Sequence, residues 1–221
     1  MRSAASVVRS LSRACICAAL LIGDISDVPG AEANGVAVAV QRPVSAPRRH
    51  LARTAAATQV FTDRTAFLAA LAALRAENAF DDVVAGAAGG LNYAINGFEY
   101  LVYTQFGADG ALYNGPGFIS TDRVGDNIVV NFSGNPVTAV GGNFWPVDFA
   151  SRPTDGSIVL QFSDGTLETI AGAGPADFRG FIFADPIFRL TIDAPDIVSP
   201  PPGKSPDRWP ALDNLIVGSV Q

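Results

Sequence analysis

The side chains that most often carry out catalysis are scarce in this sequence. The single histidine, His50, lies in an arginine-rich stretch, and Cys15 and Cys17 are the only cysteines. Residues 58–221 therefore contain neither residue type, which excludes a Ser-His-Asp or Cys-His nucleophile there. The usual nitrogen and sulfur ligands of zinc are missing as well, and no disulfide can form within these residues.

A glycosidase that uses two carboxylates stays open on composition alone. Glutamate is scarce, however, since residues 58–221 contain only Glu77, Glu99 and Glu168, and the Glu-x-Asp-x-Glu strand motif of glucanases is absent. Most aspartates stand beside Gly or Pro, where turn hydrogen bonding explains them. We therefore expect no catalytic residues and no enzyme activity.

Aromatic residues beside amides are the second kind of chemistry that the sequence offers. A sugar-binding site needs exposed rings next to hydrogen-bonding groups, and residues 113–115 (Tyr-Asn-Gly) and 143–145 (Asn-Phe-Trp) have this character. We take Tyr113, Asn143 and Trp145 as candidate ligand-binding residues. The alternative is that these rings are half-buried at sheet rims. Further aromatic candidates are Tyr93, Tyr100, Tyr103 and Trp209.

Period-two patterns predict the elements that would position these side chains. Apolar residues recur at every second position over 127–132, 157–162 and 188–192, which indicates half-buried strands. Ser163-Asp164-Gly165 predicts a hairpin. About ten strands at this spacing predict an all-β, two-sheet antiparallel sandwich of the jelly-roll type. The other expected strands cover 91–95, 97–104, 117–120, 137–144, 166–170, 179–184 and 213–218.

One short N-terminal helix is expected in front of these strands. A cap at residue 62 or 63 can begin it, and its apolar stripe consists of Phe67, Leu71 and Leu74. The pattern predicts that it runs to about Glu77. Such an amphipathic helix would cover one part of the core.

The N-terminus has the composition of an export signal. Three arginines precede the apolar run 14–23, which is the order of a secretory signal peptide and is too short to span a membrane. We assign residues 1–33 to a signal-peptide-like segment, 34–57 to a basic flexible linker and 58–221 to the sandwich domain. The alternative is an overlong start with a disordered leader. A secreted protein, extracellular or periplasmic, is expected.

The charges are segregated along the chain. Residues 1–56 hold seven arginines and three acidic residues, whereas the remainder holds eight basic and 18 acidic residues, a net charge of about −10. A body of this charge repels phosphates and anionic membranes. We expect no nucleic-acid partner.

Six short stretches, taken in order, form a recognisable set: 63–70 (DRTAFLAA), 78–82 (NAFDD), 137–144 (VTAVGGNF), 163–166 (SDGT), 180–182 (GFI) and 212–218 (LDNLIVG). Together they resemble the extracellular jelly-roll domains of bacterial exosortase-sorted (PEP-CTERM) proteins. The resemblance covers about residues 58–219 and implies a secreted sandwich, most members having no assigned activity. The chain departs from the sorted members after Gly218, where no Pro-Glu-Pro motif, apolar helix or arginine cluster follows. We therefore expect release rather than a membrane anchor.

A structural Ca²⁺ site is the sharpest hypothesis that the resemblance implies. Many sugar-binding jelly rolls hold such an ion between an acidic residue that follows an early Phe and an Asp that opens the last strand. Asp81 and Asp213 match those two positions, with Asn214 and Asp82 as further oxygen donors. Ca²⁺ takes six to eight oxygen ligands. The alternative is that all four make Asx-type turn hydrogen bonds.

Three functions follow, in this order. The first is a secreted, non-catalytic sandwich that contacts polysaccharide or protein of an extracellular matrix. The second is a calcium-dependent carbohydrate-binding module, which aromatic rings around a groove would favour. The third is a glycan-active hydrolase or lyase, which two carboxylates in a groove would favour.

Overall fold

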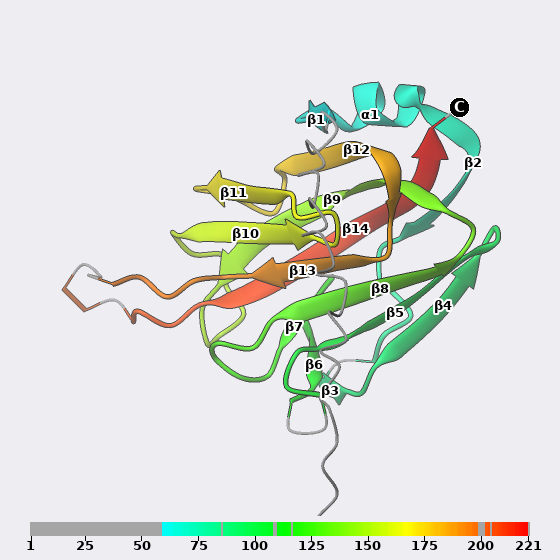
Figure 1. The fold of residues 1–221 in the computed structure, drawn as a ribbon. Coiled ribbons are helices and arrows are strands. Elements are labelled where there is room, and N and C mark those ends of the chain that lie inside the picture. Colours follow the sequence, from blue (N-terminus) through cyan, green and yellow to red (C-terminus); the bar gives the residue numbers. More distant parts are fainter. Residues whose placement is uncertain are drawn as a thin grey trace, which may run out of the picture. The chain divides into compact units, whose positions relative to one another are not determined.

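The computed structural model has two antiparallel β-sheets packed as a sandwich, with one short helix among the residues it describes (Figure 1). The predicted fold class is therefore confirmed. The signal-peptide-like segment 1–33 and the linker 34–57 lie outside the described residues. No helix in the described part of the chain has the length and apolar character needed to cross a membrane. The structure describes residues 59–84, 86–107, 110–115, 117–198, 202–203 and 205–220.

The first sheet has eight strands, and the last strand of the chain lies in its middle. Strand β14 (Trp209–Val220) pairs with β9, β7 and β2, so it joins segments from most of the domain. The order is β1 (Gln59–Phe61), β12 (Phe178–Ile187), β9 (Val137–Val147), β14, β7 (Phe118–Thr121), β6 (Leu112–Gly115) and β3 (Gly86–Ala88), with β2 (Leu71–Asn78) also on β14.

The second sheet has six strands, and the three clearest alternating runs form three adjacent ones, β10, β13 and β8. Leu160, Ile192 and Ile128 are completely buried and lie opposite one another across these three strands. Alternation predicted these strands because one face packs on the other sheet and the other meets water. The order is β11 (Leu167–Ala171), β10 (Ser157–Phe162), β13 (Arg189–Asp193), β8 (Ile128–Gly134), β5 (Phe98–Thr104) and β4 (Leu91–Ile95).

The predicted helix is correct at its start and wrong at its end. Helix α1 covers only Arg64–Ala70, and the Asp63 carboxylate caps it by accepting the Ala66 N–H at 2.6 Å. The following residues form β2 along β14, because pairing with a central strand satisfies their backbone and outweighs local helix preference. Leu74, which we placed on the helical stripe, is 55% exposed.

Helix α1 packs on the eight-stranded sheet with a single buried ring. Phe67 is completely buried and lies 5.4 Å from the Phe178 ring, between centroids. Gly141 and Gly180 leave the space for it, since a Cβ on Gly141 would stand 2.7 Å from the ring atoms of Phe67 and Phe178. These residues form a small apolar cluster separate from the core between the sheets.

The described residues contain fourteen strands rather than about ten. Strands β2, β3 and β6 were not expected from the sequence. Strand β14 begins at Trp209, so Asp213 lies inside the last strand, at a break in its register with β9, rather than opening it. The hairpin at 163–165 is confirmed, since it joins β10 to β11 with Gly165 at φ 93°.

Candidate functional site

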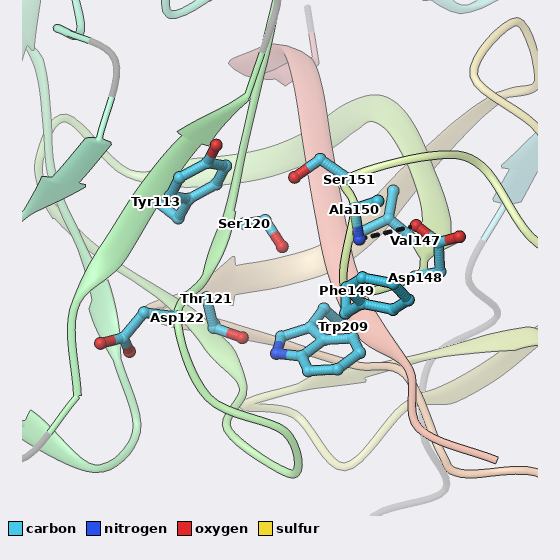
Figure 2. Close-up of a pocket in the computed structure, with 10 residues that line it drawn as sticks. All are labelled: Tyr113, Ser120, Thr121, Asp122, Val147, Asp148, Phe149, Ala150, Ser151 and Trp209. Carbon is cyan, nitrogen blue, oxygen red and sulfur yellow. Dashed lines mark hydrogen bonds between the residues drawn. The ribbon is translucent and has the colours of Figure 1, made fainter. Parts of the chain in front are cut away.

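A groove on the eight-stranded sheet gathers three aromatic side chains (Figure 2). Its volume is about 490 Å³, within the roughly 300–1,000 Å³ typical of ligand sites. Tyr113 is 38% exposed, Phe149 is 78% exposed and Trp209 is half-buried. The groove is lined by Tyr113, Ser120, Thr121, Asp122, Val147, Asp148, Phe149, Ala150, Ser151 and Trp209.

Cross-strand pairs explain why residues from distant segments share this groove. Tyr113 on β6 lies opposite Ser120 on β7, and Trp209 on β14 lies opposite Val147 on β9. Directly opposed residues in antiparallel strands present their side chains on the same face. The turn after β9 then brings Phe149 next to them, and Figure 2 shows it on the same side of the groove as Trp209.

The turn that carries Phe149 is held by the Asp148 carboxylate. Its Oδ1 accepts the N–H groups of Ala150 and Arg152 at 2.9 and 3.0 Å, and its Oδ2 accepts two guanidinium N–H groups of Arg152 at 2.7 and 3.0 Å. Burial raises the pKa of Asp148, but the hydrogen bonds and charge of Arg152 and the Ala150 N–H outweigh burial, so the pKa is lowered. The carboxylate is therefore ionised and positions the turn.

The two carboxylates that line the groove are both engaged in local structure. Asp122 accepts the Ala111 N–H at 2.8 Å, and Asp148 is held as described above. Figure 2 shows them on opposite sides of the groove, with Asp122 directed away from Asp148. A general acid needs a raised pKa, which is the reverse of the shift at Asp148. The groove therefore offers a ligand aromatic rings and hydrogen-bonding groups rather than a pair of catalytic carboxylates.

Of the three predicted ligand-binding residues, the structure places only Tyr113 at the groove. Trp145 is 3% exposed and packs edge-on against Phe118, with ring centroids 5.2 Å apart. Asn143 is 8% exposed and does not line the groove. Both were chosen because an amide and an aromatic ring stand close in sequence, but the sheet face on which they lie is covered at that point.

Trp209 was one of the aromatic candidates, whereas Phe149 was missed. The signal that was available for Phe149 is its position in the sequence Pro146-Val-Asp-Phe149-Ala-Ser-Arg-Pro153, an aromatic residue between two prolines beyond an apolar strand. A turn at this place exposes the ring, and the structure forms one there.

The predicted calcium residues Asp81, Asp213 and Asn214 lie near one another. Burial raises the pKa of Asp213, the backbone N–H of Asn214 lowers it, and the charge of Asp81 raises it further. Asn214 donates its backbone N–H and side-chain amide to the two oxygens of Asp213 at 2.6 and 2.7 Å. Asn143 stands opposite Asp213 in the β9–β14 register.

The donor set around Asp213 also fits the alternative of a turn. Asn214 has a positive φ of 51°, and its hydrogen bonds to Asp213 are local ones of the Asx kind. Asp82 is exposed and accepts the Tyr93 hydroxyl at 3.4 Å. Among the described residues, no group of three or more His, Cys, Asp or Glu side chains is placed to hold a metal ion.

Tyr93 and Tyr100 form a stacked pair away from the groove. Their ring centroids are 5.2 Å apart, and the Asn78 amide donates to the Tyr100 hydroxyl at 3.1 Å. Burial raises the pKa of Tyr93 to about 12, the Asn78 hydrogen bond opposes this shift, and the charge of Asp82 adds to it. This pair is part of the packing at β4 and β5.

A buried carboxylate in the β7–β8 loop ties this loop to the β5–β6 loop. Asp126 is 1% exposed, and its Oδ1 accepts the N–H groups of Phe106 and Asn127 at 3.0 and 2.8 Å. Its Oδ2 and the Thr104 hydroxyl are buried without a hydrogen-bond partner among the described residues. A Cβ on Gly110 would stand 2.3 Å from Oδ2, so this position requires glycine.

Comparisons of the chain with models of known protein families, with curated proteins and with solved structures give no match.

Proposed function

We propose that the protein is a secreted, non-catalytic module that binds a neutral polysaccharide through the aromatic groove. The observation that carries this proposal is the convergence of Tyr113, Phe149 and Trp209, from three separate segments, around one groove. Large exposed rings on a soluble protein tend to mark a binding surface.

The chemistry of the groove suits a sugar better than other ligands. A pyranose ring has apolar C–H faces and hydroxyl edges, so it needs flat apolar surfaces beside hydrogen-bonding groups. Here Asp122 and Ser151 stand beside the three rings. The acidic charge of residues 57–221 disfavours nucleic acid and anionic lipid.

Three further points support a binding protein that has no catalytic activity and that acts outside the cytoplasm. The Asp148 carboxylate is tied to Arg152 with a lowered pKa, which suits it to positioning rather than to proton donation. Residues 58–221 contain no His or Cys for nucleophilic chemistry. The signal-peptide-like composition of residues 1–33 supports export, where matrix polysaccharides are the available ligands.

Affinity electrophoresis of the full chain in gels that contain neutral polysaccharides tests the proposal. We expect at least one β-glucan, xylan or mannan to retard the protein, and Phe149→Ala to weaken binding about tenfold or more, equivalent to at least about 1.4 kcal/mol. Phe188→Ala is the matched control, since that ring is 61% exposed outside the groove. Trp209→Ala should weaken binding as well.

Two results would contradict the proposal. One is the absence of retardation by every neutral polysaccharide tested. The other is an equal effect of Phe149→Ala and Phe188→Ala, which would mean that the groove is not the binding site. Binding of a protein segment in the groove, lost on Phe149→Ala without any glycan binding, would assign the groove to a matrix protein instead.

We further propose that Asp81 and Asp213, with Asn214, hold a structural Ca²⁺. Burial, and to a smaller degree the nearby charge of Asp81, raises the pKa of Asp213. A bound cation would favour the charged form of both carboxylates, which supports the proposal. The ion would join the segment after β2 to β14. Its role would be stabilisation rather than chemistry, so it is separable from the groove.

A further inference from the structure

A second cavity lies on the outer face of the six-stranded sheet. Its volume is about 460 Å³, and six of its seven lining residues carry hydrogen-bonding side chains. Residues that lie opposite one another form a row across four neighbouring strands. In order, the row is Tyr103 on β5, Val129 on β8, Thr191 on β13 and Gln161 on β10. The lining residues are Tyr103, Gln105, Asn127, Val129, Gln161, Arg189 and Thr191.

A chain of hydrogen bonds orients the two strongest donors of this cavity. The Arg189 Nε donates to Asn131 Oδ1 at 2.9 Å, and the Asn131 Nδ2 donates to the Tyr103 hydroxyl at 3.1 Å. The arginine fixes the amide orientation, because Nε can only donate. The Tyr103 oxygen therefore accepts, and its own proton is left to donate elsewhere.

The guanidinium of Arg189 also has donors to spare. It is exposed, and neither Nη atom has a hydrogen-bond or ion-pair partner among the described residues. The body, with 18 acidic and eight basic residues, repels polyanions at long range, but Arg189 is the only charged side chain among the residues that line this cavity. Arg189 thus combines a fixed Nε with two unused Nη groups at the edge of a polar cavity.

We propose that this cavity binds the carboxylate of a uronic-acid residue in an acidic polysaccharide. The planar fork of Arg189 matches a carboxylate, and the Tyr103 hydroxyl adds one donor. Gln161, Thr191 and Gln105 then stand where sugar hydroxyls need partners. The site is on the opposite sheet from the aromatic groove and does not depend on it.

Calorimetric titration of the full chain with uronate oligosaccharides tests this site. The probes are tetramers of galacturonate, glucuronate and mannuronate, each beside its methyl ester, which keeps the sugar and removes the charge. We expect one acid tetramer to bind at least tenfold more tightly than its ester. Arg189→Gln should weaken that binding at least tenfold, and Tyr103→Phe should weaken it several-fold.

Two control variants separate the site from general charge and from the groove. Arg64→Gln removes the same charge from α1, where the side chain is paired with Glu77, and should not alter binding. Phe149→Ala should leave acid binding unchanged, so failure here and failure of the proposed function remain distinguishable. An unchanged melting temperature shows that Arg189→Gln folds.

Three results would overturn the proposal. They are no binding of any acid tetramer, equal binding of an acid and its ester, and equal weakening by Arg189→Gln and Arg64→Gln. The last result would mean that uniform surface charge, rather than the oriented guanidinium, attracts the ligand.

Discussion

Replacing Asp126 by alanine should destabilise the protein, whereas replacing it by asparagine should not. Alanine removes the acceptor of the Phe106 and Asn127 N–H groups, which donate to Oδ1 at 3.0 and 2.8 Å. Asparagine keeps that acceptor. It also puts an N–H₂ where the unpartnered Oδ2 stands, next to the buried Thr104 hydroxyl oxygen.

The magnitude follows from these contacts. Hydrogen bonds to a charged group contribute about 1.5–3 kcal/mol each, and an unsatisfied buried oxygen costs about 1–3 kcal/mol. The alanine variant loses the two hydrogen bonds to Oδ1, and it also removes the one unsatisfied buried oxygen, Oδ2. We therefore expect a net loss of roughly 2–3 kcal/mol in the free energy of unfolding for Asp126→Ala. Asparagine should stay within about 1 kcal/mol of the natural protein.

Urea unfolding of the natural protein and both variants, followed by tryptophan fluorescence, measures these differences. The comparison holds if the three proteins share the same dependence of unfolding free energy on urea concentration. For a domain of this size, roughly 2–3 kcal/mol corresponds to a fall in melting temperature of about 4–12 °C. If Asp126→Asn loses as much stability as Asp126→Ala, the charge on Oδ2 is used by a group outside the described residues, and our reasoning is refuted. Equal stability of all three proteins would refute it too.

Three further results are expected. Because the pKa of Asp213 is raised in the folded state, the folded protein binds more protons than the unfolded one above pH 3.8, and stability in chelator should fall as pH rises from there. Urea unfolding between about pH 4 and 7 should show a smaller fall in stability for Asp213→Asn than for the natural protein. Added calcium should offset the fall in stability only in the natural protein. An equal effect of calcium on both proteins would exclude this metal site. Tyrosinate absorbance should reveal one group ionising at about 12 that Tyr93→Phe removes, and stability should decline as pH rises through 10 towards that value; a titration unchanged by the substitution would contradict the assignment. Gly141→Ala should cost about 1–3 kcal/mol in urea unfolding, because the new Cβ meets the Phe67 ring, whereas Gly89→Ala, with no atom within 4 Å, should be neutral.

The parts of the fold that could be predicted are those whose pattern is local. Strands β10, β13 and β8 carry apolar residues at every second position because each has one face in the core, and the Asp-Gly hairpin is set by its own residues. Residues 71–78 could not be predicted as a strand. Their partner β14 lies about 140 positions further along the chain, and their Ala- and Leu-rich composition favours a helix when read alone.

The candidate site was predicted in part for a related reason. Tyr113 is exposed because it lies near the edge of the sheet, and Trp145 is buried because β9 lies near the centre, yet both are aromatic residues beside amides. Sequence spacing does not show which strand ends up central. Phe149 lies in a turn without periodicity, and the Arg189–Asn131–Tyr103 chain needs the register of three strands before its members meet.

The central position of β14 constrains the order of folding. Strands β9 and β7 are both hydrogen-bonded to residues 209–220, so the β9–β14 and β7–β14 pairs cannot form until those residues have been synthesised, although β9 can pair with β12 and β7 with β6 before then. Before that point the larger sheet exists as separate pieces with unpaired edges, which are prone to pair with other chains. A chain that stops before Trp209 would therefore be expected to aggregate rather than form a smaller sandwich. If the protein is exported as we propose, pairing that waits for residues 209–220 would keep the larger sheet open until those residues are available.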